Sequence, residues 1–464
     1  MEFLTMTFQT QEKDPLYQQL YRYLVREISS GNLREGERLP SKRSLALQLK
    51  ISQNTVENAY GMLVTEGYVR AVPKSGYYVQ RLETPSFPSV ELPKVPPVSP
   101  PPSYRYDFGT SAVDTAGFPY ATWAKLTKSV VYNSPELLNH GHPQGDLCLR
   151  EAIAKYLHGY RGVNCTPDQI VVGAGIEYLT ALIAQLLDRD LVFALENPGY
   201  GRSFHILKNS GREIRFIGLD QDGMIPEELE ERGGDIAYLT PSHQFPMGAV
   251  MPIGRRLRLL AWAGEKAGRY IIEDDYDSEF RYAGRPIPSL QGIDRGGKVI
   301  YIGTFSKSIA PSIRAAYLVL PPVLLEKFRR DFSFYSSTVS RFEQHTLAYF
   351  LEEGHFGRHL NRLRTLYRQR EELLVSLLRS TKIPLRIFGG KAGLHLLVQV
   401  KNGMTERELV RRAEGHGIRL TGLSEYCLSP VPDLPESTVV LGYGGLGGEK
   451  LREAVKLLEA SWDN

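Results

Sequence analysis

Cysteine is scarce in this chain and forms no pattern. The three cysteines among the 464 residues, Cys148, Cys165 and Cys427, are far apart, and none belongs to a CxxC pair or a Cys/His cluster. This spacing argues against a disulfide framework and against a structural zinc site, and it is typical of proteins from a reducing compartment. We therefore expect no metal and a cytoplasmic location.

Long apolar stretches are lacking as well. No run approaches the roughly 20 residues that a membrane-spanning helix needs. The first residues, MEFLTMTFQTQEKD, show no basic flank followed by an apolar segment, so we expect no secretory signal. The net charge of +4 is a small excess, which permits a polyanionic partner without requiring one. We expect no membrane partner.

A proline-rich stretch divides the chain. Eight prolines lie between residues 81 and 104, namely Pro85, Pro88, Pro93, Pro96, Pro97, Pro100, Pro101 and Pro102. Because proline fixes φ and lacks a backbone N–H, the stretch favours a semi-rigid polyproline II spacer. A ligand for the groove of another protein is the alternative. We predict a small domain at 1–80, a linker at 81–104 and a large domain at 105–464.

The small domain is predicted to be three helices followed by a hairpin. Apolar residues recur at helical spacing from Leu16 to Ile28, Ser41 and Ser52 are suited to begin two further helices, and YVRAVPKSGYYV has the pattern of a hairpin. In a helix-turn-helix protein the early residues of the last helix meet base edges in the major groove.

Polar residues occupy the positions that such a fold presents to DNA. Those at the start of the last helix suit base edges, those at the start of the middle helix suit phosphates, and those at the hairpin tip suit the minor groove. In that order they are Ser52, Gln53, Asn54 and Thr55; Ser41, Lys42 and Arg43; and Lys74 and Gly76. The pattern alone is also compatible with a small protein-interaction domain.

The large domain alternates apolar β-rich runs with helical stretches, which indicates a largely parallel sheet covered on both faces. From about residue 325 to 464 the pattern changes to long helices and then a small α+β lobe. Three β-rich runs end in polar motifs: Asp274 and Tyr276 follow one, Thr304 and Lys307 follow another, with Arg314 beyond, and Gly175 and Ile176 follow a third and open a helix.

These motifs supply what a pyridoxal 5'-phosphate (PLP) site needs. Such a site uses a lysine for the Schiff base, a carboxylate facing the pyridine nitrogen, a donor to the phenolic oxygen and a phosphate cradle. Backbone amides at a helix N-terminus and an arginine both suit the phosphate. Each motif alone is usually a surface or turn feature, and their joint occurrence at strand ends favours the cofactor.

Residues 15–80 resemble the GntR-type winged helix. Their motifs LPSKRSLA, ISQNTVENAY and EGYV follow that family's pattern almost throughout. The resemblance implies DNA contacts by Arg43, Ser52, Asn54, Thr55 and Gly76. Gln53 and Glu57 stand where the family often has arginine, so we expect a different operator from those of relatives with arginine.

Residues from about 105 to 464 resemble fold-type I aminotransferases. The segments GHPQGDLCLREAIAKYL and GTFSK carry this likeness, and with the winged helix in front the chain resembles the MocR subfamily, especially its GabR-like members. The resemblance implies that Lys307 forms the Schiff base, Asp274 faces the nitrogen, Tyr276 faces the phenolic oxygen, and Thr304 and Arg314 hold phosphate. It also implies that Tyr200 and Arg202 line the effector pocket, and that the protein is a homodimer, with domain swapping as one arrangement. His243 is a further pocket candidate.

Two departures from the aminotransferase pattern concern activity. Phe245 stands where those enzymes commonly have the asparagine that contacts the phenolic oxygen. No arginine occurs from Ser437 through Lys450, and the position that holds a substrate carboxylate in relatives falls on or near Gly445. Losing that partner weakens the binding of an ordinary α-amino acid unless another cation, Arg202 or Arg419, replaces it.

The sequence therefore predicts a transcriptional regulator that binds double-stranded promoter DNA and senses PLP or an amino compound that reacts with PLP. The aminotransferase-like domain is expected to serve sensing, with at most weak transaminase activity. The alternatives are an active PLP-dependent aminotransferase with an accessory DNA-binding domain, and an interaction module whose winged helix binds protein.

Overall fold

The computed structural model describes residues 6, 14–82, 102–282, 288–390 and 392–463. The chain forms two compact units, Met1–Pro100 and Pro101–Asn464. Most of the predicted linker, residues 83–101, lies outside the described residues. Within the described ranges, no helix combines the length and the apolar character needed to cross a bilayer.

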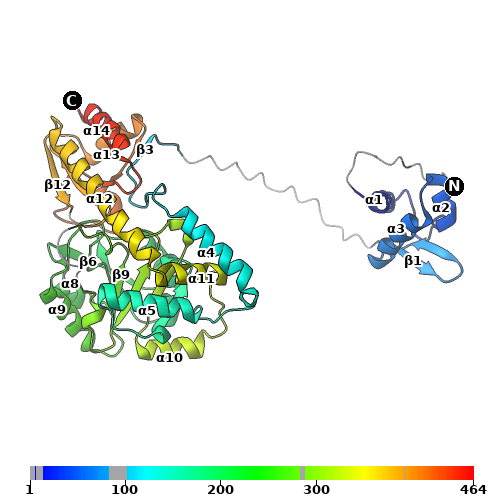
Figure 1. Ribbon diagram of the computed structural model, residues 1–464, viewed down its shortest axis with the longest axis horizontal. Coiled ribbons are helices and arrows are strands. Elements are labelled where there is room, and N and C mark those ends of the chain that lie inside the picture. The colour runs from blue at the N-terminus through cyan, green and yellow to red at the C-terminus, as the bar shows by residue number, and fades with distance from the viewer. Residues whose placement is uncertain (1–5, 7–13, 83–101, 283–287, 391, 464) are drawn as a thin grey trace. The chain divides into compact units, whose positions relative to one another are not determined.

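The first unit is a three-helix domain with a two-stranded wing (Figure 1). Its elements are α1 (Leu16–Ser29), α2 (Lys42–Leu49), α3 (Gln53–Thr65), β1 (Val69–Val72) and β2 (Gly76–Val79). The two strands pair antiparallel, with Val69 opposite Val79. Buried side chains of all three helices and both strands form one core, in which Leu24, Val56 and Leu63 are fully buried.

The second unit is built on an eight-stranded sheet of order β4-β11-β10-β9-β8-β5-β6-β7. Its strands are β4 (Ile170–Gly173), β5 (Phe193–Asn197), β6 (Ile214–Asp220), β7 (Gly223–Met224), β8 (Ile236–Leu239), β9 (Tyr270–Asp275), β10 (Val299–Thr304) and β11 (Ala316–Val319). The central pairs from β10 to β6 are parallel, and β11 runs antiparallel to both of its neighbours.

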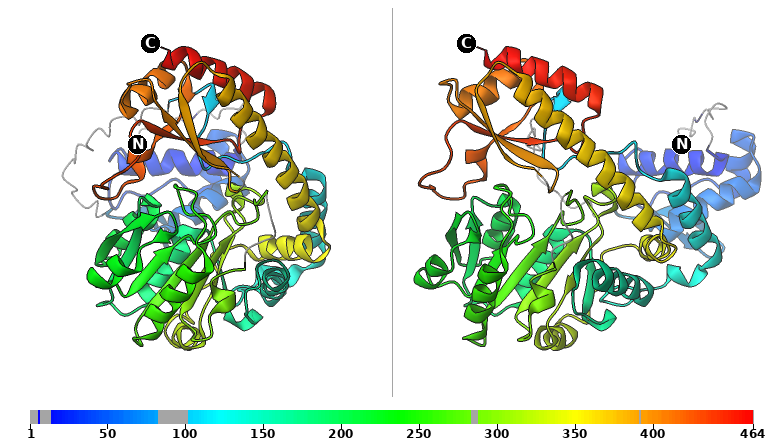
Figure 2. Two further views of the ribbon diagram at one scale, coloured as in Figure 1. Left: turned by 90° about the vertical axis from the view of Figure 1, so that its left-hand side faces the viewer. Right: turned by 60° about the vertical axis from the view of Figure 1, so that its left-hand side comes forward.

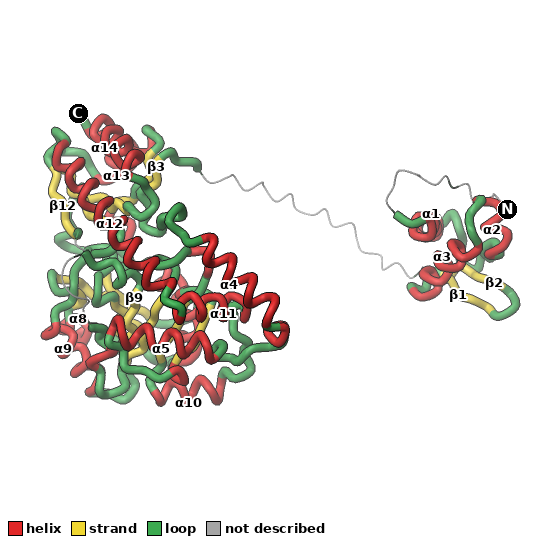
Figure 3. The backbone as a smooth tube through the Cα atoms, viewed as in Figure 1, coloured by secondary structure: helices red, strands yellow, loops and turns green. Residues whose placement is uncertain are grey.

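Helices cover both faces of this sheet, as Figures 2 and 3 show. They are α4 (Tyr120–Asn133), α5 (Leu147–Arg161), α6 (Ile176–Leu186), α7 (Gly201–Asn209), α8 (Pro226–Glu231), α9 (Ile253–Gly264), α10 (Pro322–Asp331) and α11 (Arg341–Glu352), with short 3-10 turns η1 (Pro135–Leu138), η2 (Pro167–Gln169), η3 (Gln291–Ile293) and η4 (Pro311–Ile313). Successive residues of β10 point to opposite cores: Ile300 and Ile302 pack with α6 and α10, while Tyr301 packs with α5 and α11. This alternation explains the continuous apolar runs of the sequence, since a strand buried on both faces has no polar side.

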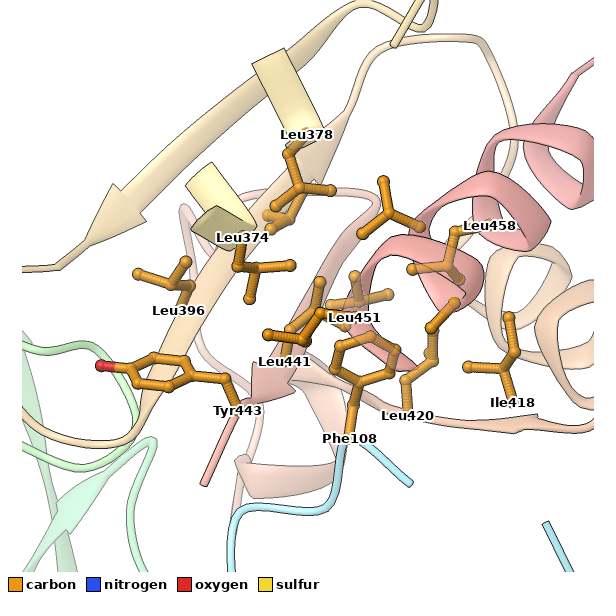
Figure 4. Packing of buried hydrophobic residues seen from close by; sticks show 14 of the residues in the cluster. Phe108, Leu374, Leu378, Leu396, Ile418, Leu420, Leu441, Tyr443, Leu451 and Leu458 are labelled. Carbon is orange, nitrogen blue, oxygen red and sulfur yellow. The ribbon is translucent and has the colours of Figure 1, made fainter. Parts of the chain in front are cut away.

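The small lobe has a four-stranded sheet of order β12-β13-β16-β15 and a two-stranded pair, β14-β3. Its elements are β3 (Tyr106–Asp107), α12 (His355–Ser380), β12 (Leu385–Gly389), β13 (His395–Val400), α13 (Glu406–Gly415), β14 (Ile418–Arg419), β15 (Thr421–Gly422), η5 (Leu423–Tyr426), β16 (Thr438–Gly442) and α14 (Gly448–Trp462). Figure 4 shows its core, where Phe108 lies among leucines of α12, β13, β16 and α14.

The small lobe differs from the expected span of about 325–464. Leu324 and Phe328 of α10 pack in one core of the large sheet, and Leu347 of α11 packs in the other. Conversely, Tyr106 and Phe108, far earlier in the chain, belong to the small-lobe core because β3 pairs with β14. The lobe therefore takes its members from both ends of the second unit, and the long helix α12 leads into it (Figures 1 and 2).

Candidate functional site

The winged unit presents most of its predicted DNA contacts to solvent. Ser41, Arg43, Ser52, Gln53, Asn54 and Lys74 are exposed, while Lys42, Thr55 and Gly76 are partly buried. The first turn of α3 is thus open to a groove of DNA, as the helix-turn-helix geometry requires.

The two serines in this set, Ser41 and Ser52, also have a structural role as helix caps. Ser41 Oγ accepts the backbone N–H of Ser44 at 3.1 Å, and Ser52 Oγ accepts that of Thr55 at 3.1 Å. Each bond satisfies a backbone donor that the helix leaves free at its start. Ser52 Oγ also lies 2.8 Å from Thr55 Oγ1, a pair in which either hydroxyl can be the donor.

An ion pair joins α2 to α3, the helix whose early residues are predicted to meet base edges. Lys42 Nζ lies 2.6 Å from Glu57 Oε1, and both side chains are partly exposed. The sequence alone suggested a phosphate contact for Lys42 and an unusual operator because of Glu57. The structure shows that these two residues neutralise each other.

Arg38 is a cation of this surface that the sequence analysis missed. A Cβ at Gly76 would lie 3.0 Å from Arg38 Nε, so the guanidinium packs directly over the backbone of the wing. Gly76 has φ +134, and Lys74 beside it has φ +61. Exposed Arg38 and Lys74 thus give the wing two positive charges, and the signal in the sequence was only a basic residue just before the LPS motif.

In the second unit, the predicted cofactor residues meet at the carboxyl ends of the parallel strands. β10 pairs with β9 so that Ile302 lies opposite Asp274, and Lys307 follows three residues after β10 ends. The carboxyl edge of such a sheet is where open α/β folds bind ligands.

Asp274 is buried, and only one of its two carboxylate oxygens has a hydrogen-bond partner. Its Oδ2 accepts the hydroxyl of Tyr238 at 2.7 Å, whereas its Oδ1 is buried without a hydrogen-bond partner. Burial raises the pKa of Asp274 to about 7, although the Tyr238 bond acts against the rise. An unpartnered buried carboxylate oxygen costs free energy, and a protonated ring nitrogen is the kind of donor that would relieve that cost.

Lys307 follows the neighbouring strand, and its ammonium group donates a hydrogen bond to the carbonyl oxygen of Thr110. Burial lowers the pKa of Lys307 to about 8, and the charge of Arg202 acts in the same direction while Asp277 opposes it. A lysine with this pKa is uncharged in about a tenth of the molecules at pH 7, far more than an ordinary lysine, and the uncharged amine is a nucleophile toward an aldehyde.

Tyr276 and His243 are in contact. The Tyr276 hydroxyl donates to the His243 carbonyl at 3.0 Å, and His243 Nδ1 lies 2.9 Å from Asp277 Oδ2. Asp277 was missed from the sequence, although it stands in the same YIIEDDYDSEF motif as Asp274 and Tyr276. His243 thus belongs to the polar network of the site.

Phe245, which replaces the usual asparagine, lies at the centre of an aromatic cluster. Its ring centroid is 6.0 Å from those of Tyr200 and Tyr276, 5.3 Å from that of His395 and 5.0 Å from that of Tyr426. Phe245 therefore shapes the apolar wall of the site and supplies no hydrogen bond through its side chain.

The phosphate-cradle candidates also come together. Gly175, with φ +94, precedes α6, and a Cβ there would lie 2.3 Å from Arg314 Nη2. Ile176 is the first residue of α6, and the Thr304 hydroxyl donates to Ser306 Oγ at 2.9 Å. Arg314 and Arg202 are both paired with Glu177, a residue that the sequence analysis did not select.

The missing arginine has a structural explanation. A Cβ at Gly445 would lie 2.7 Å from that of Ala112, and a Cβ at Gly444 would lie 2.4 Å from the Ala112 carbonyl. The segment after β3 packs on this backbone and leaves no room for a side chain. Arg419, one suggested substitute, is exposed and paired with Asp107 at 3.3 Å.

These residues fit PLP. The buried Asp274 Oδ1 lacks a donor, the absence of a side chain at Gly175 lets Arg314 lie against the start of α6, and Lys307 combines an amine with a lowered pKa. Among the described residues, no group of three or more His, Cys, Asp or Glu side chains is placed to hold a metal ion.

Comparison with known families defines the class of protein. Residues 16–79 match the model of the bacterial regulatory proteins of the gntR family, and residues 107–428 match that of aminotransferase class I and II. The chain is therefore a winged-helix regulator joined to an aminotransferase-like domain.

Curated relatives that match over almost their whole length make the assignment more specific. The chain is 40% identical to the HTH-type transcriptional regulator YdeL of Bacillus subtilis, covering 97% of each chain. It is 34% identical to the probable rhizopine catabolism regulatory protein MocR of Rhizobium meliloti, covering 97% of this chain and 94% of that one. The chain belongs to the MocR-like group of GntR-type HTH transcriptional regulators.

Solved structures confirm the fold of the second unit. Pyrococcus horikoshii kynurenine aminotransferase, solved in complex with PMP, superposes with a TM-score of 0.67 at 23% identity, covering 77% of this chain and 90% of that one. The α-aminoadipate aminotransferase LysN of Thermus thermophilus, complexed with N-(5'-phosphopyridoxyl)-L-leucine, gives 0.66 at 24% identity, with 77% and 91% covered. Both likenesses confirm the predicted aminotransferase fold of the second unit.

Proposed function

We propose that this regulator binds PLP at Lys307 and couples occupancy of that site to promoter binding by its winged helix. The observation that carries the proposal is the buried Asp274 Oδ1, which has no donor from the protein and lies on the strand next to the one that leads to Lys307. A PdxR regulator of Corynebacterium glutamicum, 32% identical, is named for pyridoxine biosynthesis, which supports a ligand of this chemical class.

Different residues of the chain are proposed to hold different parts of the cofactor. Lys307 would offer the amine for covalent attachment, Asp274 would pair with the ring nitrogen, and Tyr276, with Tyr200 and Phe245 nearby, would form the walls around the ring. Arg314, Thr304 and the backbone amides after Gly175 suit the phosphate. When bound, PLP supplies an aldehyde that reacts with primary amines and a ring that withdraws electrons.

The effector is proposed to be PLP itself or an amino compound that reacts with it. Ala112 packs over Gly445, so a carboxylate-binding arginine has no place there. The domain is therefore proposed to sense rather than to turn over amino acids, and Arg202 and His243 are proposed to contact the effector. The family relationship supports a regulator over a dedicated aminotransferase.

Visible absorption and DNA binding test the proposal together. Purified protein titrated with PLP is expected to develop a visible band that Lys307→Ala lacks, and its affinity for its own upstream region is expected to change with PLP. Lys266→Ala, at an exposed lysine outside the site, is the matched control and should behave as the wild type. A protein that stays colourless in excess PLP, or whose promoter binding ignores PLP, contradicts the proposal.

A homodimer is proposed as the working form, with the cytoplasm as its location. Tyr132 of α4, Leu138 of η1 and Phe334 between α10 and α11 expose 77–79% of their surface, and α4 and η1 both pack against α11. Large apolar side chains exposed on adjoining elements are typical of interfaces. Light scattering that finds a monomer at micromolar concentration contradicts this assembly.

A further inference from the structure

Glu177, the second residue of α6, bridges the two arginines of the cofactor site. Arg314 Nη2 donates to Glu177 Oε2 at 2.7 Å, and Arg202 Nη1 donates to Oε1 at 3.1 Å. The carboxylate also accepts a hydrogen bond from its own backbone amide. It therefore folds back over the start of α6, where the free N–H groups of a helix attract an anion.

The space around Gly175 shows how closely these groups meet. A Cβ at Gly175 would lie 2.3 Å from Arg314 Nη2 and 3.0 Å from Glu177 Oε2. The guanidinium and the carboxylate thus lie together against the backbone of this glycine. Glu177 therefore occupies Arg314 Nη2, the guanidinium nitrogen beside the start of α6, and a phosphate that approaches the α6 amides would compete with it for that donor.

Glu177 carries a full negative charge near neutral pH. Burial acts to raise its pKa, but the hydrogen bonds from Arg314 and from its own amide outweigh burial, so its pKa lies below the ordinary value. A phosphate dianion that enters the cradle therefore meets a like charge and loses part of the attraction of Arg314. Both effects weaken phosphate binding.

We propose that Glu177 is an internal competitor of the ligand phosphate, which makes cofactor occupancy weak enough to be reversible. The inference rests on the proposed function and adds its regulation. An enzyme benefits from a permanently held cofactor, whereas a sensor must exchange its ligand with the free pool to report concentration. By weakening phosphate binding inside the cradle, Glu177 would allow this exchange.

The test compares Glu177→Gln with the wild type in phosphate-free buffer. Equilibrium dialysis of full-length protein against PLP is expected to show a dissociation constant about twofold to fivefold lower for Glu177→Gln, because the side-chain shape is kept while the charge is lost. Glu177→Asp keeps the charge and should bind more weakly than Glu177→Gln. Glu227→Gln, which removes an exposed carboxylate paired with Arg258, is the matched control and should equal the wild type.

Inorganic phosphate gives a second readout that does not depend on covalent attachment. As a competitor of PLP, it is expected to act at about twofold to fivefold lower concentration on Glu177→Gln than on the wild type. Unchanged or weaker PLP binding by a folded Glu177→Gln protein overturns the inference, because Glu177 would then only hold Arg314 in place. If the wild type binds no PLP at all, the proposed function fails and this inference fails with it.

Discussion

Tyr238 donates its hydroxyl to one oxygen of Asp274 at 2.7 Å, and the other carboxylate oxygen is buried without a partner. Tyr238 reaches Asp274 from β8, the strand next to β9 in the sheet. The tyrosine thus holds one oxygen of the carboxyl group and leaves the other for a ligand. This arrangement is the basis of the first prediction.

Asp274→Asn is expected to weaken PLP binding by about tenfold to a hundredfold, since a charge-assisted hydrogen bond is replaced by a neutral one. Equilibrium dialysis of the full-length protein measures the change. Asp222→Asn, at an exposed carboxylate, is the control. Equal affinity of Asp274→Asn and the wild type would show that Asp274 has no contact with the ligand.

The contribution of three buried carboxyl groups to the stability of the PLP-free protein is expected to fall as pH rises. Burial raises the pKa of Asp274 and of Glu196 to about 7, and that of Glu279 to about 8. A carboxyl group with a higher pKa in the folded state binds its proton more tightly there, so its contribution is full below the unfolded value of about 4 and is lost as pH rises through 7 to 8.

Thermal unfolding of the PLP-free protein at several pH values between 5 and 8.5 measures this effect. Asp274→Asn removes the contribution of Asp274. The midpoint temperature of unfolding of the variant, relative to that of the wild type, should therefore increase as pH rises. A constant difference between the two proteins across this range would contradict the assignment of a raised pKa to Asp274.

Glu57→Gln is expected to strengthen non-specific DNA binding. The change frees Lys42, which lies 2.6 Å from Glu57, to contact a phosphate. One additional phosphate contact steepens the dependence of log K on log salt by about 0.9. Fluorescence anisotropy with a random duplex at several salt concentrations measures the slope, and Glu27→Gln on α1 is the control. An unchanged slope would show that Lys42 stays away from the DNA backbone.

Ser52 variants separate capping from DNA contact. Ser52→Ala loses the bond from the Thr55 amide and is expected to destabilise α3 by about 1 kcal/mol. Ser52→Asp keeps a cap of equal quality but places a negative charge against phosphate. Amide hydrogen exchange in α3 should therefore be faster in Ser52→Ala only, while DNA affinity should be lowest in Ser52→Asp. Full DNA affinity in Ser52→Asp would remove Ser52 from the interface.

Gly445→Ala is expected to destabilise the second unit by about 1–3 kcal/mol, since its Cβ would lie 2.7 Å from that of Ala112. At Gly159, inside α5, nothing lies within 4 Å of an added Cβ, so Gly159→Ala is the control. Denaturant unfolding measures both. If the two variants are equally stable, the segment around Ala112 moves aside easily, and the explanation for the absent arginine is wrong.

The sequence by itself was sufficient for the order of elements and for the local motifs. Ser52 before an amphipathic helix, and Asp274 and Thr304 at the ends of apolar runs, were recognisable because periodicity, capping and strand-end position depend on neighbours along the chain. The winged-helix and aminotransferase folds were predicted from the resemblance of the motifs to known families, and both folds are confirmed.

Only the tertiary structure decided which groups are paired. Tyr238 meets Asp274, Glu177 meets Arg314 137 residues away, and Ala112 covers Gly445. Such contacts depend on how sheets and lobes pack, and no periodicity along the chain records them. The charge state and burial of the site residues, and the space around them, therefore depend on contacts between segments that are distant along the chain. These properties govern how the site holds a ligand.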